Sequence, residues 1–231
     1  KARLDRGEDI VILDSRPWEE YRLMSIPGGQ CCPGAELAYR AWDAVPSADA
    51  LVVVNCAGRT RSIIGAQSLI NAGIPNRVVA LKDGTMGWHL NGFELLRGVD
   101  ELLPLPANAA EIATARARAR ALAEKLGARF IDRAGLVALL AEKDRTTYRF
   151  DVRLPEDYAA GHLPGFLNAP GGQLVQATDT WAPVKNARIV LADVHGVQGP
   201  MTAHWLRQMD WEVYVLEGGF GGATLVKTAP G

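Results

Sequence analysis

A set of residues that occurs twice, at a constant interval of 137 positions, constrains the fold of this chain more than any other feature. The matched segments occupy the same places in each copy: Asp14–Arg16 and Asp151–Arg153, Ile26–Gly28 and Leu163–Gly165, Val52–Val54 and Ile189–Leu191. Towards the end of each copy the interval shortens by two residues, so that Leu81–Gly84 corresponds to Leu216–Gly219. Matches in one register over this length indicate two tandem homologous domains and not a short-period solenoid.

Within each copy, short apolar runs alternate with segments of helical pattern. In the first copy the pattern predicts strands and helices in alternation: Ile10–Leu13, Pro17–Met24, Leu51–Asn55, Arg61–Ala72 and Val78–Leu81. Apolar, β-branched strands separated by helices are typical of a parallel sheet that is covered on both faces. The sequence therefore predicts an α/β fold in which each domain is a parallel sheet with helices on both faces.

The second copy contains an additional predicted strand, Ala128–Ile131, followed by a helix over Gly135–Lys143. Its counterpart in the first copy would precede residue 1, so we expect the first domain to be truncated at its N-terminus. We expect this domain to span residues 1–103, a linker with a helix to span 104–126, and the second domain to span 127–231. The linker helix, over 109–126, carries arginines at 116, 118 and 120 that fan around its axis, which predicts a solvated connecting helix.

Composition excludes several classes of function. The net charge is −1 over 231 residues, which gives no basic surface for nucleic acid or for an acidic membrane. No apolar run is long enough to cross a bilayer. Three cysteines do not form a disulfide framework, and a reducing, cytoplasmic compartment is the expected location. The four histidines show no metal-ligand spacing with the cysteines, so neither a metal nor a cofactor is expected.

The segment Cys56–Arg61 carries the strongest chemical signal. It follows the predicted strand Leu51–Asn55 and precedes a helix, so backbone N–H groups at the helix N-terminus converge near the thiol. The helix dipole together with Arg59 and Arg61 favours the thiolate form at neutral pH. A buried cysteine is more often inert packing, but inert cysteines have no use for adjacent cations. Cys31 and Cys32, which lack such neighbours, are expected to pack in the core, with a resolving-thiol role as the alternative.

These motifs resemble the rhodanese family of sulfurtransferases, in order and over nearly the whole chain. Three segments carry the resemblance: Asp14–Arg16 with Ile26–Gly28, the Cys56 loop, and Gly84–Trp88 after the last strand of the first copy. The order of the two domains departs from well-known two-domain rhodaneses, whose active cysteine lies in the second domain. The chain therefore resembles a piece of a longer array of rhodanese repeats.

The resemblance implies transfer of a sulfane sulfur from thiosulfate or a related anionic donor to a thiophilic acceptor, through a persulfide on Cys56. The acceptor would be cyanide in assays and a thiol in cells, including a thiol of a protein. Substrate-binding roles fall on the loop, in which the cations would bind the anion, the backbone N–H groups would hold the persulfide, and the hydroxyls would add donors: Ala57, Gly58, Arg59, Thr60, Arg61 and Ser62. Ser62 can equally be a helix N-cap. Asp14 and Arg16 are expected to be a supporting, structural pair.

The residues are compatible with three functions. A thiosulfate-type sulfurtransferase is favoured, and the alternative is a persulfide carrier or protein-interaction module with little turnover of its own. Phosphatase relatives carry a loop one residue longer than Cys56–Arg61, which disfavours that chemistry. In the second copy Asp193 replaces the cysteine and both loop arginines are absent, so we expect the second domain to be catalytically inactive.

Overall fold

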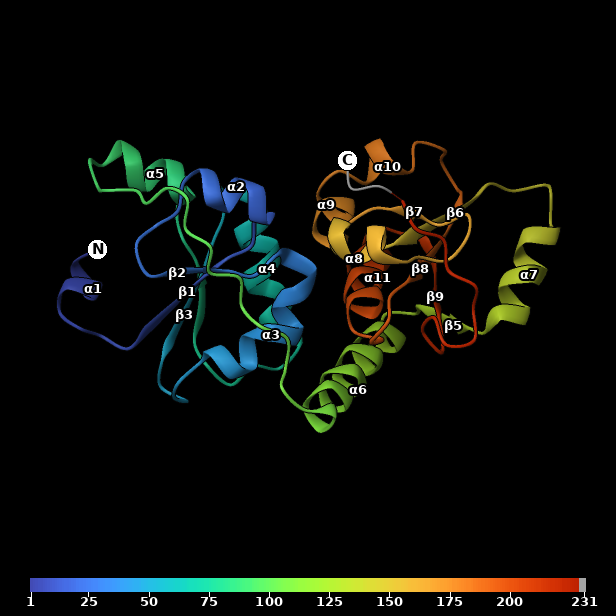
Figure 1. Cartoon of the computed structure of the whole chain (residues 1–231), viewed down its shortest axis with the longest axis horizontal. Coiled ribbons are helices and arrows are strands. Elements are labelled where there is room, and N and C mark those ends of the chain that lie inside the picture. Colours follow the sequence, from blue (N-terminus) through green and yellow to red (C-terminus); the bar gives the residue numbers. More distant parts are fainter. Residues whose placement is uncertain (229–231) are drawn as a thin grey trace. The chain divides into compact units, whose positions relative to one another are not determined.

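The computed structural model describes residues 1–228 and divides into two compact units, with the boundary between Glu111 and Ile112 (Figure 1). Residues 229–231, the end of the predicted second domain, lie outside the described residues. Each unit contains one parallel sheet flanked by helices, which confirms the predicted α/β fold with two domains of the same kind.

The sheet of the first unit has four strands in the order β2-β1-β3-β4. The elements of this unit, in chain order, are α1 (Ala2–Asp5), β1 (Ile10–Asp14), α2 (Trp18–Leu23), β2 (Gly29–Cys31), the short helix η1 (Gly34–Glu36), α3 (Leu37–Ala44), β3 (Leu51–Asn55), α4 (Thr60–Asn71), β4 (Val78–Ala80) and α5 (Gly84–Leu90). The predicted strands and helices of this copy are all present, with bounds that differ by one residue at some ends.

Alternate residues of β1 are buried against opposite faces of this sheet, as the pleat of a strand requires. Leu13 packs with Leu37 of α3 and Leu69 of α4 on one face. Ile12 packs with Ile26 and with Trp88 of α5 on the other face. Helices therefore cover both faces, and the loops that leave the carboxyl ends of β1 and β3 emerge at one edge of the sheet.

The second unit has a five-stranded parallel sheet in the order β5-β9-β8-β6-β7. Its elements, in chain order, are α6 (Ala109–Lys125), β5 (Arg129–Ile131), α7 (Arg133–Ala141), β6 (Thr147–Asp151), α8 (Pro155–Ala160), β7 (Leu167–Asn168), α9 (Gly171–Gln176), α10 (Thr178–Trp181), β8 (Arg188–Ala192), α11 (Gln198–Gln208) and β9 (Glu212–Leu216). Helix α6 begins in the last residues of the first unit and continues into the second.

The registers of the two sheets repeat one another. Ile10 pairs with Leu51 between β1 and β3, and Thr147 pairs with Arg188 at the same places in β6 and β8. Strand β5 lies next to β9, and no strand occupies the corresponding place beside β4 among the described residues of the first unit. The interval of 137 residues is thus an interval between equivalent positions in two copies of one sheet.

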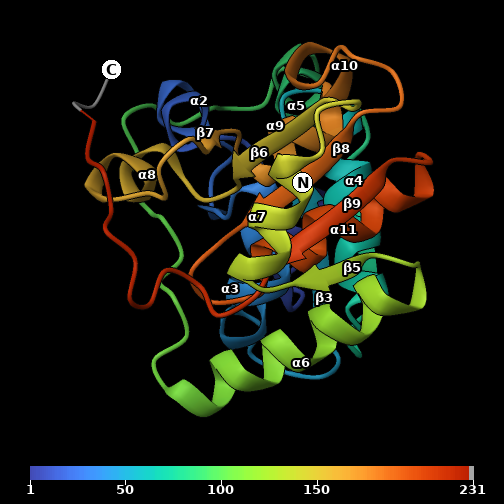
Figure 2. The ribbon, with the colours of Figure 1, turned by 90° about the vertical axis from the view of Figure 1, so that its right-hand side faces the viewer.

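Helix α6 differs from the prediction that it is a solvated connection. Ala115, Ala119 and Ala123 are buried along one face of this helix, and Ala123 belongs to the core of the second unit. Arg120 stacks over Phe130 of β5, and Figure 2 shows α6 running beside that strand. Alanines at four-residue spacing form a smooth stripe that packs closely, and the spacing of the arginines does not reveal this stripe.

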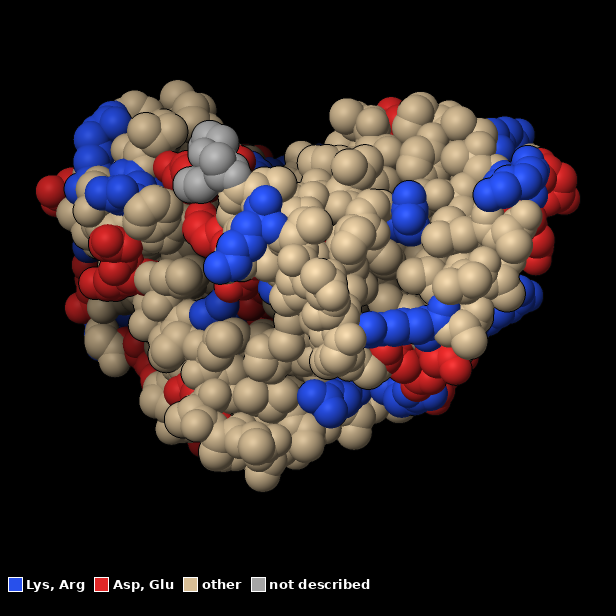
Figure 3. Space-filling model, turned by 45° about the vertical axis from the view of Figure 1, so that its right-hand side comes forward, with Lys and Arg blue, Asp and Glu red and all other residues tan. Residues whose placement is uncertain are grey.

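The described surface agrees with the small net charge. Basic and acidic side chains are interspersed over the face seen in Figure 3, without a large area of one sign. None of the helices in the described part of the chain combines the length and the apolar composition of a membrane-spanning segment.

Candidate active site

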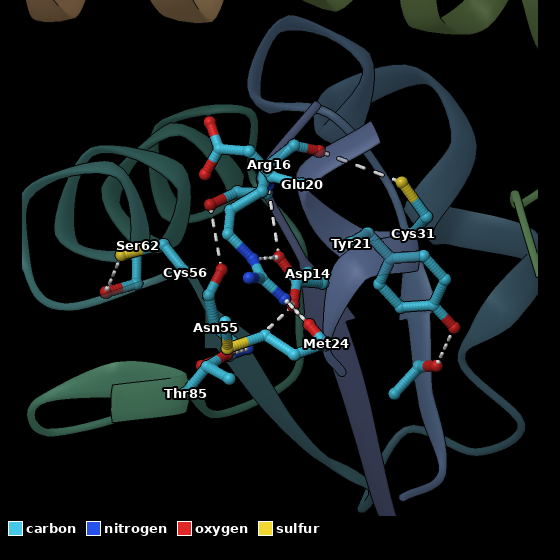
Figure 4. A network of polar contacts seen from close by, with 12 residues as sticks. Asp14, Arg16, Glu20, Tyr21, Met24, Cys31, Asn55, Cys56, Ser62 and Thr85 are labelled. Carbon is cyan, nitrogen blue, oxygen red and sulfur yellow. Dashed lines mark hydrogen bonds and ion pairs between the residues drawn. The ribbon is translucent and has the colours of Figure 1, made fainter. Parts of the chain in front are cut away.

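Cys56 follows β3 directly, at the carboxyl end of the first sheet, and its residue is only 2% exposed. Its Sγ atom lies 3.4 Å from the hydroxyl oxygen of Ser62, which in turn donates to the carbonyl oxygen of Arg59 at 2.9 Å. Helix α4 begins at Thr60, so its N-cap is Arg59, and the alternative that Ser62 is the N-cap is wrong. Ser62 is instead a hydroxyl that faces the thiol (Figure 4).

The start of α5 fixes the backbone of the loop after Cys56. The N–H of Thr85 donates to the carbonyl oxygen of Cys56 at 2.8 Å, and the N–H of Met86 donates to that of Ala57 at 2.9 Å. Gly84, at φ +56°, allows this approach, because a Cβ atom there would lie 2.2 Å from the carbonyl oxygen of Cys56. The glycine of the Gly84–Trp88 motif therefore serves the loop directly.

A buried polar network lies next to the loop and connects the elements that hold it (Figure 4). Arg16 donates to both carboxylate oxygens of Asp14, at 2.8 and 2.7 Å, and to the carbonyl oxygen of Met24 at 2.7 Å. The amide nitrogen of Asn55 donates to Asp14 at 2.7 Å and to the hydroxyl of Thr85 at 2.9 Å. These bonds tie the ends of β1 and β3 to α5. Asn55 and Thr85 were not among the sequence candidates, although Asn55 immediately precedes the cysteine.

The two loop arginines have different surroundings. Both terminal nitrogens of Arg61 donate to the carboxylate of Glu20 on α2, at 2.6 and 2.7 Å. This pair lowers the pKa of Glu20 and raises the pKa of Arg61. Arg59 is exposed, and no carboxylate among the described residues pairs with its guanidinium. Of the two cations, only Arg59 is thus left uncompensated.

The remaining loop positions lie nearer the surface. Ala57 and Gly58 are half-buried and Thr60 is exposed at the first position of α4. A cavity of about 310 Å³ lies beside the loop and is lined by Arg59 together with residues of α4, of the end of β4 and of the chain after it: Ile63, Ala80, Leu81, Lys82 and Asp83. The structure thus brings Cys56, Ser62 and the loop backbone together, and it directs Arg61 towards α2.

The other two cysteines differ from Cys56 in their surroundings. Cys31 and Cys32 are fully buried, and all three cysteines are free thiols. Burial raises the pKa of the Cys31 thiol to about 12 and that of Cys32 well above its ordinary value. Within residues 1–228, no cluster of histidine, cysteine or carboxylate side chains has a geometry that could hold a metal ion.

The second unit preserves the frame of this site with different chemistry. Arg153 pairs with Asp151, and Gly219 has φ +56°, as their counterparts do in the first unit. At the cysteine position, the Asp193 carboxylate is buried and one of its oxygens accepts from the N–H groups of Val197 and Gln198, at 2.8 and 2.9 Å. Burial raises the pKa of Asp193, and these bonds act in the opposite direction. The side-chain carboxyl group of Asp193 therefore occupies the backbone N–H groups at the start of α11.

Comparison with known proteins gives one family. Residues 1–91 and 134–223 match the family described as Rhodanese-like domain. A search of the curated proteins finds no match.

Among solved structures, a thiosulfate sulfurtransferase from Pseudomonas aeruginosa is 49% identical over 100% of this chain, with a TM-score of 0.93. This chain covers 44% of that one. A 3-mercaptopyruvate sulfotransferase from Escherichia coli is 18% identical, with 94% of this chain and 95% of that chain covered and a TM-score of 0.38. A protein from Bacillus halodurans is 21% identical over 48% of this chain and 82% of its own, with a TM-score of 0.37. Scores this low add nothing to the fold.

Proposed function

This chain belongs to the rhodanese family, and we propose that its first unit is a sulfurtransferase that uses Cys56 to move sulfane sulfur from thiosulfate or a related anionic donor to a thiophilic acceptor. The observation that carries the proposal is the position of Cys56, which lies at a strand end before a helix N-terminus, in a loop held by α5. The similarity to the thiosulfate sulfurtransferase from Pseudomonas aeruginosa supports the donor, and it concerns 44% of that chain.

The proposed reaction has two displacement steps. The Cys56 thiolate attacks the outer sulfur of thiosulfate, a new S–S bond forms, the S–S bond of thiosulfate breaks, and sulfite leaves with the electron pair. The persulfide then holds one additional sulfur and one negative charge. Cyanide or a thiolate attacks that outer sulfur, takes it as thiocyanate or as a new persulfide, and returns the Cys56 thiolate. No external oxidant or reductant is required.

The second unit supports a proposal for the groups that would hold the persulfide. Its Asp193 carboxylate accepts from Val197 and Gln198, which correspond to Thr60 and Arg61 at the interval of 137 residues. The N–H groups of Thr60 and Arg61 are therefore the donors proposed for the outer sulfur of Cys56. The Ser62 hydroxyl, 3.4 Å from Sγ, would turn to donate when Cys56 is a thiolate.

A direct test is the formation of thiocyanate from thiosulfate and cyanide by the purified chain. Turnover that follows ping-pong kinetics would support the sulfurtransferase. A persulfide that forms on Cys56 but is not turned over would instead favour the carrier or interaction module. Hydrolysis of an aryl phosphate without sulfur transfer would point to a phosphatase, and either result would contradict the proposal.

Arg59 is predicted to contribute more to donor binding than Arg61. Arg59→Ala should raise the KM for thiosulfate about tenfold, because a charge-assisted contact to an anion is worth roughly 1.5 kcal/mol at an exposed position. Arg61→Ala should raise it only about threefold, because Glu20 already compensates that cation. Steady-state kinetics measure both effects. Arg77→Ala is the matched control and should leave KM unchanged. Arg77 is an exposed arginine that directly precedes β4, at the opposite end of the sheet from the loop.

Asp193→Cys is predicted not to create a second active site. The loop of the second unit has no arginine to attract the donor or to stabilise a thiolate. In a Cys56→Ser background, thiosulfate:cyanide activity of Asp193→Cys should stay at the level of the blank. Transplanting the whole first loop onto positions 193–199 should give more activity than the single change. Robust turnover by Asp193→Cys alone would show that the loop charges matter little.

A further inference from the structure

The ion pair between Arg61 and Glu20 takes no part in the two displacement steps proposed above. It joins Arg61, the second residue of α4, to Glu20 of α2, a helix that begins 42 residues before α4. The Arg61 side chain is 15% exposed and the Glu20 side chain 42%. The carboxylate is oriented on both terminal nitrogens of Arg61, at 2.6 and 2.7 Å. Pairing with Glu20 is the main cause of the raised pKa of Arg61, and the charge of a Cys56 thiolate adds to it. Glu20 therefore neutralises a cation that lies within electrostatic reach of the reacting sulfur.

This pair is not what holds α2 in place. Tyr21, the next residue, is fully buried, and its hydroxyl donates to the carbonyl oxygen of Gly29 at 2.6 Å. Trp18 donates from its indole nitrogen to Asp100 at 3.0 Å. A half-exposed ion pair adds little stability to a helix already anchored at two points.

The second unit has the equivalent helix and loop but not this ion pair. There, Tyr158 of α8 also donates to a backbone carbonyl, that of Phe166, at 2.9 Å, and the Arg153–Asp151 pair is kept. The positions that correspond to Glu20 and Arg61 are Asp157 and Gln198, and Gln198 carries no charge with which to form such a pair. The same helix and loop are thus built without the ion pair in the unit that lacks the cysteine. The pair accompanies the chemistry and is not required by the fold.

We propose that Glu20 sets the affinity of the sulfur-transfer loop for its anions, by neutralising Arg61 and leaving Arg59 as the uncompensated cation of the loop. This inference rests on the proposed function. Thiosulfate is a dianion and sulfite leaves as one, so a loop with two uncompensated cations would bind the donor more tightly but would also retain the product. The Glu20 carboxylate weakens both interactions and favours release of sulfite after the first step.

The test is Glu20→Gln, which removes the charge and keeps an oxygen that can accept from Arg61. We expect the KM for thiosulfate to fall threefold to tenfold, the inhibition constant of sulfite to fall by a similar factor, and kcat to fall where sulfite release limits turnover. Glu19→Gln makes the same change of charge at an exposed neighbour on α2, which forms no hydrogen bond or ion pair with the loop in the described part of the chain, and should behave like the wild type. In Glu20→Gln/Arg61→Ala, both charges are absent, and KM should return to within about twofold of the wild-type value.

Two results would overturn the proposal. One is a KM that rises in Glu20→Gln, which would mean that the carboxylate positions the loop. The other is an effect equal to that of Glu19→Gln, which would mean that no specific compensation exists. If the wild-type chain shows no sulfur transfer, the proposed function fails by itself. Calorimetric titration of sulfite into wild-type and Glu20→Gln protein then still tests the charge proposal, since it expects tighter binding by the variant without any turnover.

Discussion

Gly84→Ala is expected to reduce sulfur transfer more than a hundredfold, although residue 84 carries no chemical group. A Cβ atom at this position would lie 2.2 Å from the carbonyl oxygen of Cys56 and 2.8 Å from the next peptide unit. Both are backbone atoms, which cannot rotate away as a side chain can. The loop must therefore shift, and displacement of a nucleophile by about 1 Å is enough to cost on the order of a hundredfold in rate. Steady-state thiocyanate formation measures the effect.

Two further glycines provide controls for this prediction. Gly92 has φ +75° with nothing within 4 Å of a Cβ, so Gly92→Ala tests the left-handed backbone alone, at a cost of about 1 kcal/mol. Gly219 is the equivalent of Gly84 in the second unit, where a Cβ would lie 2.8 Å from the carbonyl oxygen of Val194. Gly92→Ala and Gly219→Ala should both retain the wild-type kcat/KM. Thermal unfolding shows whether Gly84→Ala still folds. Equal activity of Gly84→Ala and Gly92→Ala would contradict the proposed role of this contact.

Cys56→Ser should abolish both the persulfide and the turnover. Brief exposure to thiosulfate should add the mass of one sulfur atom to the wild-type chain, and peptide mapping should place it on Cys56 alone. Cys31 and Cys32 lie in the core, where burial raises the pKa of each thiol, to about 12 for Cys31, so that neither supplies thiolate at neutral pH. Cys31→Ala and Cys32→Ala should therefore keep the persulfide and the activity, with a loss of stability only. The added mass on either buried cysteine, or full activity in Cys56→Ser, would sink the assignment.

Periodicity and duplication were enough to predict the architecture. Leu51–Asn55 was predicted as a strand with the bounds that β3 has, and α4 begins one residue before its predicted start. These features are local, because a run of β-branched residues or a helical pattern is visible within one segment. The interval between copies added long-range information, since it matched β1 and β3 to β6 and β8.

Contacts between distant residues could not be predicted in this way. Arg61 resembles a free anion-binding residue in the sequence, because nothing near it in the chain shows that Glu20 lies against it. Asn55 and Thr85 are polar residues of ordinary type, and their place beneath the loop follows only once β1, β3 and α5 are assembled. For α6 the difficulty was different, because alanine is too weakly apolar for Ala115, Ala119 and Ala123 to indicate a buried face.

The Asp193 carboxylate has a consequence for the stoichiometry of the whole chain. It is tethered to the loop whose N–H groups it occupies, so its effective concentration there far exceeds that of a free anion in solution. Diffusing thiosulfate or sulfite would have to displace an intramolecular competitor from α11. Titrations should therefore saturate at one loop-bound anion for each chain, although the chain contains two loops of this type. If activity is divided by the number of domains, the specific activity of the active loop is underestimated by a factor of about two.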